Sequence, residues 1–145
     1  MSRVRKQIEA FLKDQDVDVT PHTPDETRSV EQQWRQTYAA GVKRATGSWI
    51  YGGFRWHGFS SKHEKALEGE RALQAYLSQW PAPYVVFDEE GTWSLGCASQ
   101  TYPDFSLLGA DIYVSHHNMK WTMAFTHEQP HDGPFFAERR ATPGR

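Results

Sequence analysis

Hydrophobic residues recur with helical spacing in the first third of the chain. One stripe predicts an amphipathic helix over residues 3–14, and a second predicts a helix that ends near residue 44. The second helix begins at a capping box, because Thr23 and Glu26 flank Pro24 with the required spacing. The polar segment between the two helices is expected to be a linker. The stripes consist of Val4, Ile8, Phe11 and Leu12, and of Val30, Trp34, Tyr38 and Val42.

The middle of the chain is expected to form short strands around one further helix. This helix runs from Glu68 to Gln79 and ends there because Pro81 and Pro83 follow it. Strands are predicted where aromatic and β-branched residues cluster between glycines or turn residues. The predicted strands cover residues 48–51, 54–59, 84–87 and 92–96.

The clearest element is a hairpin over residues 111–128, with Asn118 and Met119 in its turn. In this register Val114 faces Met123, and the large apolar side chains all lie on one face. A slip of one residue would mix the two faces, so the pattern selects the register. The facing pairs are Ile112 with Phe125, Val114 with Met123 and His116 with Trp121, and the second face consists of Asp111, Tyr113, Ser115, Thr122 and Thr126.

These elements predict one α+β domain, in which N-terminal helices pack on a mainly antiparallel β-sheet. The expected organisation is an N-terminal helix and linker over residues 1–24, an α+β body over residues 25–137 and a frayed tail over residues 138–145. The body would end with a strand within residues 133–137. A chain of 145 residues has the usual size of one domain and buries enough surface to fold without a metal or a disulfide.

Composition narrows the classes of function. The net charge is −2, with 16 basic and 18 acidic residues, which argues against a nucleic-acid binder with a basic stripe. No stretch approaches the ~18 apolar residues of a membrane span, and the start of the chain lacks the apolar run of a signal peptide. The single cysteine, Cys97, is expected to be a small buried thiol. We therefore expect a cytoplasmic protein without a membrane partner.

Two histidine patterns suggest metal binding, and both are disfavoured. The segment His127-Glu128-Gln129-Pro130-His131 matches the zinc-protease pattern H-E-x-x-H, but Pro130 disfavours the helix that this motif needs. A site of His116, His117 and His127 is disfavoured because His127 lies far from the turn along its strand. The two adjacent histidines should also point to opposite faces. We expect no metal and no cofactor.

Two groups of short motifs resemble those of a known family. The first group is Trp56-His57-Gly58-Phe59-Ser60 with Leu67-Glu68-Gly69-Glu70-Arg71-Ala72, and the second is Asp111-Ile112-Tyr113-Val114, Trp121-Thr122, Thr126-His127-Glu128 and Gly133-Pro134-Phe135-Phe136. Together they resemble W-H-x-F-S and W-T-x-x-x-T-H-E…G-P-[YF]-F in an uncharacterised family of small bacterial proteins, a domain of unknown function. The resemblance covers about residues 30–137 and leaves residues 95–108 unmatched. It implies domain boundaries and a bacterial origin, and no activity.

The sequence leaves three hypotheses of function open. The first is a non-catalytic protein-binding module, for example an immunity protein that neutralises a cognate bacterial toxin, because the chain is small, mildly acidic and rich in Trp and Tyr. Its contact residues are predicted to be Trp49 and Tyr51 in a glycine-flanked segment. The alternative is a small enzyme or ligand binder that uses His57, His127 and Glu128, which otherwise form a structural hydrogen-bond network. The third is a purely structural subunit.

Overall fold

The computed structural model describes residues 3–38, 66–128 and 133–139. Within these ranges the chain forms three α-helices, one short 3-10 helix and seven strands. The elements in chain order are α1 (Arg3–Asp14), β1 (Asp18–Pro21), α2 (Pro24–Tyr38), β2 (Leu67–Glu68), α4 (Glu70–Leu77), β3 (Tyr84–Asp88), β4 (Ser94–Ala98), η2 (Ser106–Leu108), β5 (Ile112–His116), β6 (Trp121–Phe125) and β7 (Phe135–Glu138).

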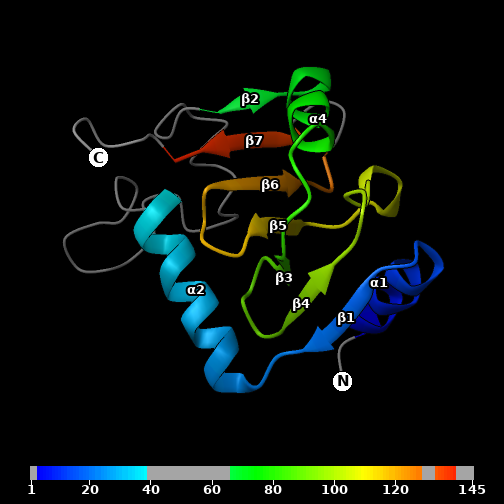
Figure 1. Cartoon of the computed structure of the whole chain (residues 1–145), viewed down its shortest axis with the longest axis vertical. Helices are drawn as coiled ribbons and strands as arrows, with labels where there is room; N and C mark the ends of the chain where they lie inside the picture. The colour runs from blue at the N-terminus through cyan, green and yellow to red at the C-terminus, as the bar shows by residue number, and fades with distance from the viewer. Residues whose placement is uncertain (1–2, 39–65, 129–132, 140–145) are drawn as a thin grey trace.

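All seven strands form a single sheet in the order β1-β4-β3-β5-β6-β7-β2, and every neighbouring pair is antiparallel (Figure 1). The helices α1 and α2 precede most of the sheet in the chain. The predicted α+β class, with N-terminal helices and an antiparallel sheet, is therefore confirmed. The sheet forms by local hairpins at its centre, whereas its two outermost strands come from earlier parts of the chain.

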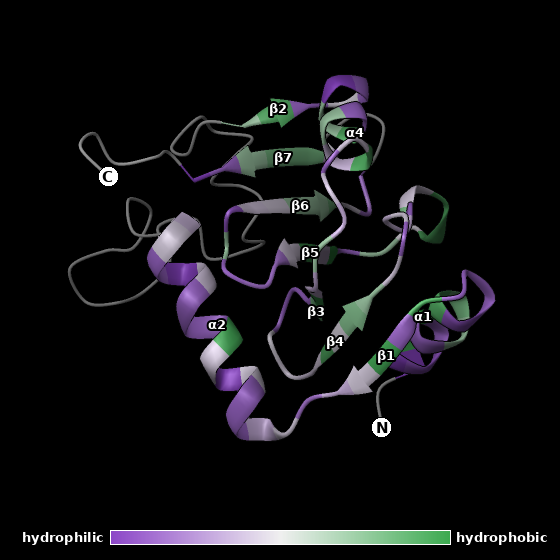
Figure 2. Ribbon diagram, in the orientation of Figure 1, coloured by the Kyte–Doolittle hydropathy of each residue, from purple (hydrophilic) through white to green (hydrophobic). Residues whose placement is uncertain are grey.

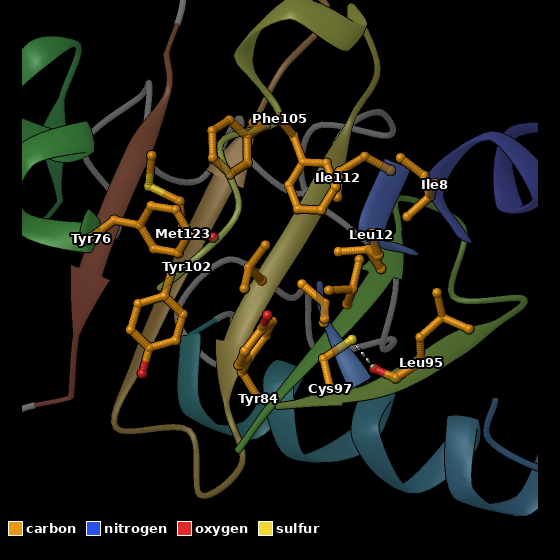
Figure 3. Packing of buried hydrophobic residues seen from close by; sticks show 14 of the residues in the cluster. Ile8, Leu12, Tyr76, Tyr84, Leu95, Cys97, Tyr102, Phe105, Ile112 and Met123 are labelled. Carbon is orange, nitrogen blue, oxygen red and sulfur yellow. Dashed lines mark hydrogen bonds between the residues drawn. The ribbon is translucent and has the colours of Figure 1, made fainter. Parts of the chain in front are cut away.

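Helices cover both faces of the sheet, because alternate side chains of each strand enter different cores. In β3, Val86 belongs to the apolar cluster that contains Ile8 of α1 and Tyr76 of α4. Its neighbour Phe87 belongs to a second cluster, which contains Trp34 of α2. Figure 3 shows the first cluster, with side chains from α1 and α4 directed onto one face of the sheet. The sheet is thus the middle layer between α1 and α4 on one side and α2 on the other.

The hairpin of β5 and β6 has the predicted register. Val114 pairs with Met123 and Ile112 pairs with Phe125, and all four side chains lie in the cluster beneath α1 and α4. Trp121 is only 3% exposed and its ring lies 6.2 Å from that of His116, as the register predicts.

The second face of this hairpin is buried against α2. Trp34 donates its indole N–H to the hydroxyl of Thr122 at 2.9 Å, and Thr122 also bonds with Ser115 at 2.7 Å. Figure 2 shows that α2 is hydrophilic over most of its length, so it attaches to the sheet through few residues. The buried polar groups Trp34 Nε1, Thr122 and Ser115 on this face thus form hydrogen bonds with one another.

The predicted capping box at the start of α2 is present. The Glu26 backbone N–H donates to the Thr23 hydroxyl at 3.2 Å, and the Glu26 carboxylate accepts the Thr23 N–H at 2.9 Å. This backbone hydrogen bond lowers the pKa of Glu26. The local sequence signal was sufficient because both partners lie within one helical turn.

Two elements differ from the expectation. Part of the expected linker forms β1, which pairs with β4 at the edge of the sheet. The third helix begins at Glu70 and not at Glu68, because Leu67 and Glu68 form β2 and pair with β7. The expected strands over residues 48–51 and 54–59, the helix after Tyr38 and residues 140–145 of the expected tail lie outside the described residues.

Candidate functional site

Among the Trp, Tyr and Phe side chains that the structure describes, Trp80 is the one that is exposed. It is 89% exposed, whereas the other Trp, Tyr and Phe side chains in the described ranges are buried or half-buried. It lies in the connection between α4 and β3, directly before Pro81. Such an exposed tryptophan contributes little to the core, and its side chain is accessible to a partner.

The backbone around Trp80 is held in place by a buried tyrosine. The Tyr102 hydroxyl donates to the Trp80 carbonyl at 2.6 Å and accepts the Ala82 N–H at 3.1 Å. Tyr102 is itself packed against the rings of Tyr76 and Trp121. Its burial raises the pKa of the Tyr102 hydroxyl, so this group stays protonated and can donate. Trp80 is therefore presented on a fixed loop.

An acidic groove adjoins this loop. The groove has a volume of about 380 Å³, and Asp16 and Asp18 are among its lining residues. No lysine or arginine is found among the described residues that line it. We call Trp80 and this groove the Trp80 surface. The lining consists of Asp16, Asp18, Pro81, Ala82, Pro83, Ala98, Ser99 and Gln100.

Asp16 is positioned by the end of α1. It has a positive φ of 59°, and its N–H donates to the Lys13 carbonyl at 3.1 Å. The following N–H, of Val17, donates to the Leu12 carbonyl at 3.1 Å. These two bonds form a Schellman motif, in which a left-handed residue ends the helix and the next residue packs against its last turn. The groove thus has one fixed acidic corner.

A second pocket, also of about 380 Å³, lies on the α2 side of the same edge of the sheet. It shares Asp18, Pro83 and Ala98 with the acidic groove. We call it the His22 pocket. Its described lining consists of Asp18, Thr20, His22, Val30, Gln33, Pro83, Tyr84, Val85, Gly96, Cys97, Ala98, His117 and Met119.

A chain of hydroxyl groups orients His22 in this pocket. His22 Nδ1 lies 2.8 Å from the Ser94 hydroxyl, which lies 2.8 Å from the hydroxyl of Thr27. Ser94 is 1% exposed, so it cannot reach a substrate and acts only by holding the ring. The other ring nitrogen lies above Gly96, where an added Cβ would come within 2.9 Å of Nε2. A side chain at position 96 would therefore displace the imidazole from this place.

The structure places one of the predicted site histidines in a different partnership. His127 bonds with Asp111 through its backbone N–H at 3.0 Å and through Nδ1 at 2.8 Å. The hydrogen bond with Asp111 raises the pKa of His127. This pair joins the segment before β5 to the end of β6. Glu128 is exposed, and His57 lies outside the described residues, so the three-residue site stays a prediction.

The orientation expected for the adjacent histidines was wrong. The rings of His116 and His117 lie 4.4 Å apart with an interplanar angle of 31°, so they do not point to opposite faces. The reason is that β5 ends at His116, and strand alternation no longer applies to the residue after it. Burial, and then the adjacent His117, lower the pKa of His116.

The remaining predicted residues have mixed outcomes. Cys97 is a buried thiol, as expected, with Sγ 3.7 Å from the Leu95 carbonyl (Figure 3). Burial raises the pKa of Cys97 to about 12, which disfavours a reactive thiolate. The predicted contact residues Trp49 and Tyr51 lie outside the described ranges, and so do Pro130 and His131 of the zinc-like motif.

The described residues contain neither a metal site nor a membrane-spanning helix. No group of three or more His, Cys, Asp or Glu side chains within residues 3–38, 66–128 and 133–139 is arranged to hold a metal. The absence of bound zinc stays a prediction, because His131 lies outside the described residues. None of the described helices has the length and hydrophobicity needed to cross a bilayer.

Sequence reasoning missed both Trp80 and His22. Trp80 follows Leu73, Tyr76 and Leu77 at spacings that continue an apolar stripe, so the pattern favoured burial. The available signal was Pro81, which ends the helix before the stripe can continue. His22 had no local signal, because its partner Ser94 is 72 residues away in the chain.

Comparison with models of protein families matches residues 6–136 to a domain of unknown function (DUF4275). The matched range includes residues 95–108, which the motif resemblance did not cover. No curated protein and no solved structure matches the chain significantly.

Proposed function

Because the chain belongs to the family of the domain of unknown function DUF4275, whose description gives no activity, we propose a function from the surface of the chain itself. We propose that it is a non-catalytic protein-binding module and that the Trp80 surface contacts the partner. The observation that carries this proposal is an 89% exposed tryptophan on a loop held by the Tyr102 hydroxyl.

The energetic argument starts from the cost of displaying this side chain. Burying a tryptophan removes roughly 150–250 Å² from water, at about 25 cal/mol per Å². This free energy is not used in the fold, and it becomes available when a partner covers Trp80. The fixed backbone lowers the entropy lost on binding, because the loop is already ordered. Tryptophan is also enriched among residues that dominate binding energy.

The acidic groove indicates the chemistry of the partner. Asp16 and Asp18 favour a surface that carries lysine or arginine, and they disfavour a nucleic-acid backbone. Arginine also interacts favourably with the face of a tryptophan ring. An immunity protein that covers a basic surface of a cognate bacterial toxin is one module of this kind. We place it in the cytoplasm, since its lone thiol, Cys97, is buried and reduced.

The test requires a purified partner, identified by affinity capture from the native host and mass spectrometry. Trp80→Ala should then weaken binding by about thirtyfold, which corresponds to about 2 kcal/mol. Leu107→Ala is the matched control, because Leu107 is 98% exposed but does not line the groove. Both variants should unfold at the same denaturant concentration as the wild type.

Trp49→Ala and Tyr51→Ala belong in the same comparison, since the sequence predicts these two as contact residues. If they reduce affinity and Trp80→Ala does not, the module binds through another surface. If none of the three changes alters the affinity of a confirmed partner, the proposed role of exposed aromatic residues is wrong.

A small enzyme or ligand binder that uses His57, His127 and Glu128 is the second candidate. One observation favours it: Asp111 bonds with His127 Nδ1, which is how an acid–base histidine is commonly oriented. The same bonds also explain a purely structural role. Activity that is lost in His127→Gln and Glu128→Gln, at unchanged stability, would favour this candidate over the binding module.

A further inference from the structure

We propose that the His22 pocket binds a guanidinium group, carried by a small molecule or by an arginine side chain. This site has a different lining from the Trp80 surface, although the two share Asp18, Pro83 and Ala98 at their common edge. It therefore adds a second binding site to the molecule and does not depend on the proposed protein-binding function.

The lining of the pocket suits a polar head group on an apolar stem. Because Gly96 has no side chain, the Nε2 edge of the His22 ring occupies the space that a Cβ would need there, and both residues line the pocket. The apolar part of the lining consists of side chains that can contact methylene groups, mainly Val30, Pro83, Val85 and Met119. A volume of about 380 Å³ is within the range of small-ligand pockets and exceeds what a guanidinium alone would fill.

In one of its two tautomers, His22 is an acceptor at the end of the hydroxyl chain. When Nδ1 carries the proton, it donates to the Ser94 hydroxyl, which can in turn donate to the Thr27 hydroxyl. Nε2 then carries a lone pair beside Gly96, which also lines the pocket. Ser94 and Thr27 are buried, so this arrangement is fixed before any ligand enters. An N–H donor of a ligand would complete the chain.

The charge of the lining favours a cation. Asp18 is the one formally charged side chain among the described lining residues, which include no lysine or arginine. Thr20 and Gln33 add further oxygen acceptors at the rim. A guanidinium is flat, presents five N–H donors and is weakly hydrated, whereas an ammonium is compact and strongly hydrated. The apolar lining and its several acceptors therefore fit the guanidinium better than a lysine-like group.

Three probes with the same four-carbon stem separate head-group geometry from charge. Butylguanidinium should shift the backbone amide signals of His22 and Gly96 in NMR titrations of the full chain, with a Kd of about 1 mM or tighter. Butylammonium should bind at least about tenfold more weakly, and pentanoate should not bind. Equal binding of the two cations, or absence of binding by butylguanidinium at about 20 mM, would overturn the proposal.

A capped arginine, N-acetyl-arginine methylamide, distinguishes the two sources of the group. Binding as tight as that of butylguanidinium supports an arginine side chain of a partner, because the pocket then admits a peptide backbone. Binding of butylguanidinium alone supports a free small molecule. Both results require the same guanidinium recognition at His22.

Paired variants test which residues of the His22 pocket bind the guanidinium group. His22→Asn retains a polar atom near the Nδ1 position but lacks Nε2, and should reduce butylguanidinium binding at least about tenfold, whereas His22→Gln should reduce it less. Asp18→Asn should weaken binding, and Asp16→Asn should not, because Asp16 does not line this pocket. Unchanged binding in His22→Asn and Asp18→Asn would refute the site. Trp80→Ala should leave it intact, so failure here is distinguishable from failure of the Trp80 surface.

Discussion

The two faces of the sheet are built from different kinds of contact. Beneath α1 and α4 the core is almost entirely apolar, and aromatic rings such as Tyr76, Trp121 and Phe125 meet edge to face. Beneath α2 the buried side chains also form hydrogen bonds that cross from helix to sheet, such as Trp34 to Thr122. Buried apolar area and close packing stabilise the first face. The second face also depends on hydrogen-bond donors and acceptors that are paired with one another.

This difference bears on where function can arise. On the first face the buried hydroxyls of Tyr76 and Tyr102 bond with backbone carbonyls, so little polar chemistry remains there apart from the loop that displays Trp80. The polar contacts beneath α2 orient specific atoms, and His22 is the case in which one such atom lies at a pocket. The two faces should therefore respond differently to substitution, and the changes below test that expectation.

The largest effect is expected on the apolar face, from Trp121→Ala. Trp121 is 3% exposed and contacts three aromatic rings, so the change should cost about 3–5 kcal/mol of the free energy of unfolding. Urea denaturation measures it, with Trp80→Ala as the exposed control, for which about 0.5 kcal/mol or less is expected. A loss below about 1 kcal/mol would show that Trp121 does not belong to the core.

A substitution that keeps the shape of the side chain and removes its hydroxyl tests the face beneath α2. Thr122→Val keeps the volume but removes the hydroxyl that bonds with Trp34 and Ser115, so both partners lose a hydrogen bond in a buried place. We expect a loss of about 1–3 kcal/mol in urea denaturation. The exposed Thr101→Val should stay within about 0.5 kcal/mol of the wild type. If the two variants behave alike, the hydrogen bonds beneath α2 contribute little.

The capping box at the start of α2 should contribute less. Thr23→Ala removes the acceptor for the Glu26 N–H and should cost about 1 kcal/mol in the same assay. Thr37→Ala, later in the same helix, is the control and should not destabilise, since alanine is the better helix former. Equal effects at both positions would contradict a capping role.

The smallest effect is a pH dependence that arises from His127. Its pKa is raised in the folded state by the hydrogen bond with Asp111, so the stabilisation is fully present below about pH 6.5, the ordinary pKa, and is lost as pH rises through the raised value. The difference in denaturation midpoint between wild type and His127→Gln should therefore shrink from pH 5.5 to pH 8.5. His116, whose lowered pKa acts with the opposite sign, is present in both proteins and cancels. A difference that grows with pH would contradict this pairing.

Local patterns allowed much of the fold to be predicted, and long-range contacts account for what was missed. The register of β5 and β6 could be predicted because alternation within one hairpin distinguishes the two faces. Strand β1 could not, because Val19 is its one inward apolar residue and its partner Cys97 lies far along the chain. The candidate sites were harder still, since His22 depends on β1 and Trp80 continues an apolar stripe whose pattern favours burial.

The order of the sheet has a consequence for the behaviour of the protein at high concentration. Among the strands that the structure describes, the outermost are β1, which has four residues and includes Pro21, and β2, which has two residues. Proline lacks the N–H that a further strand would need, and Asp18 adds a charge to the same edge. Short, charged edges of this kind resist the edge-to-edge growth that leads to aggregates. The molecule can therefore display an apolar side chain such as Trp80 without offering its sheet as a template for self-association.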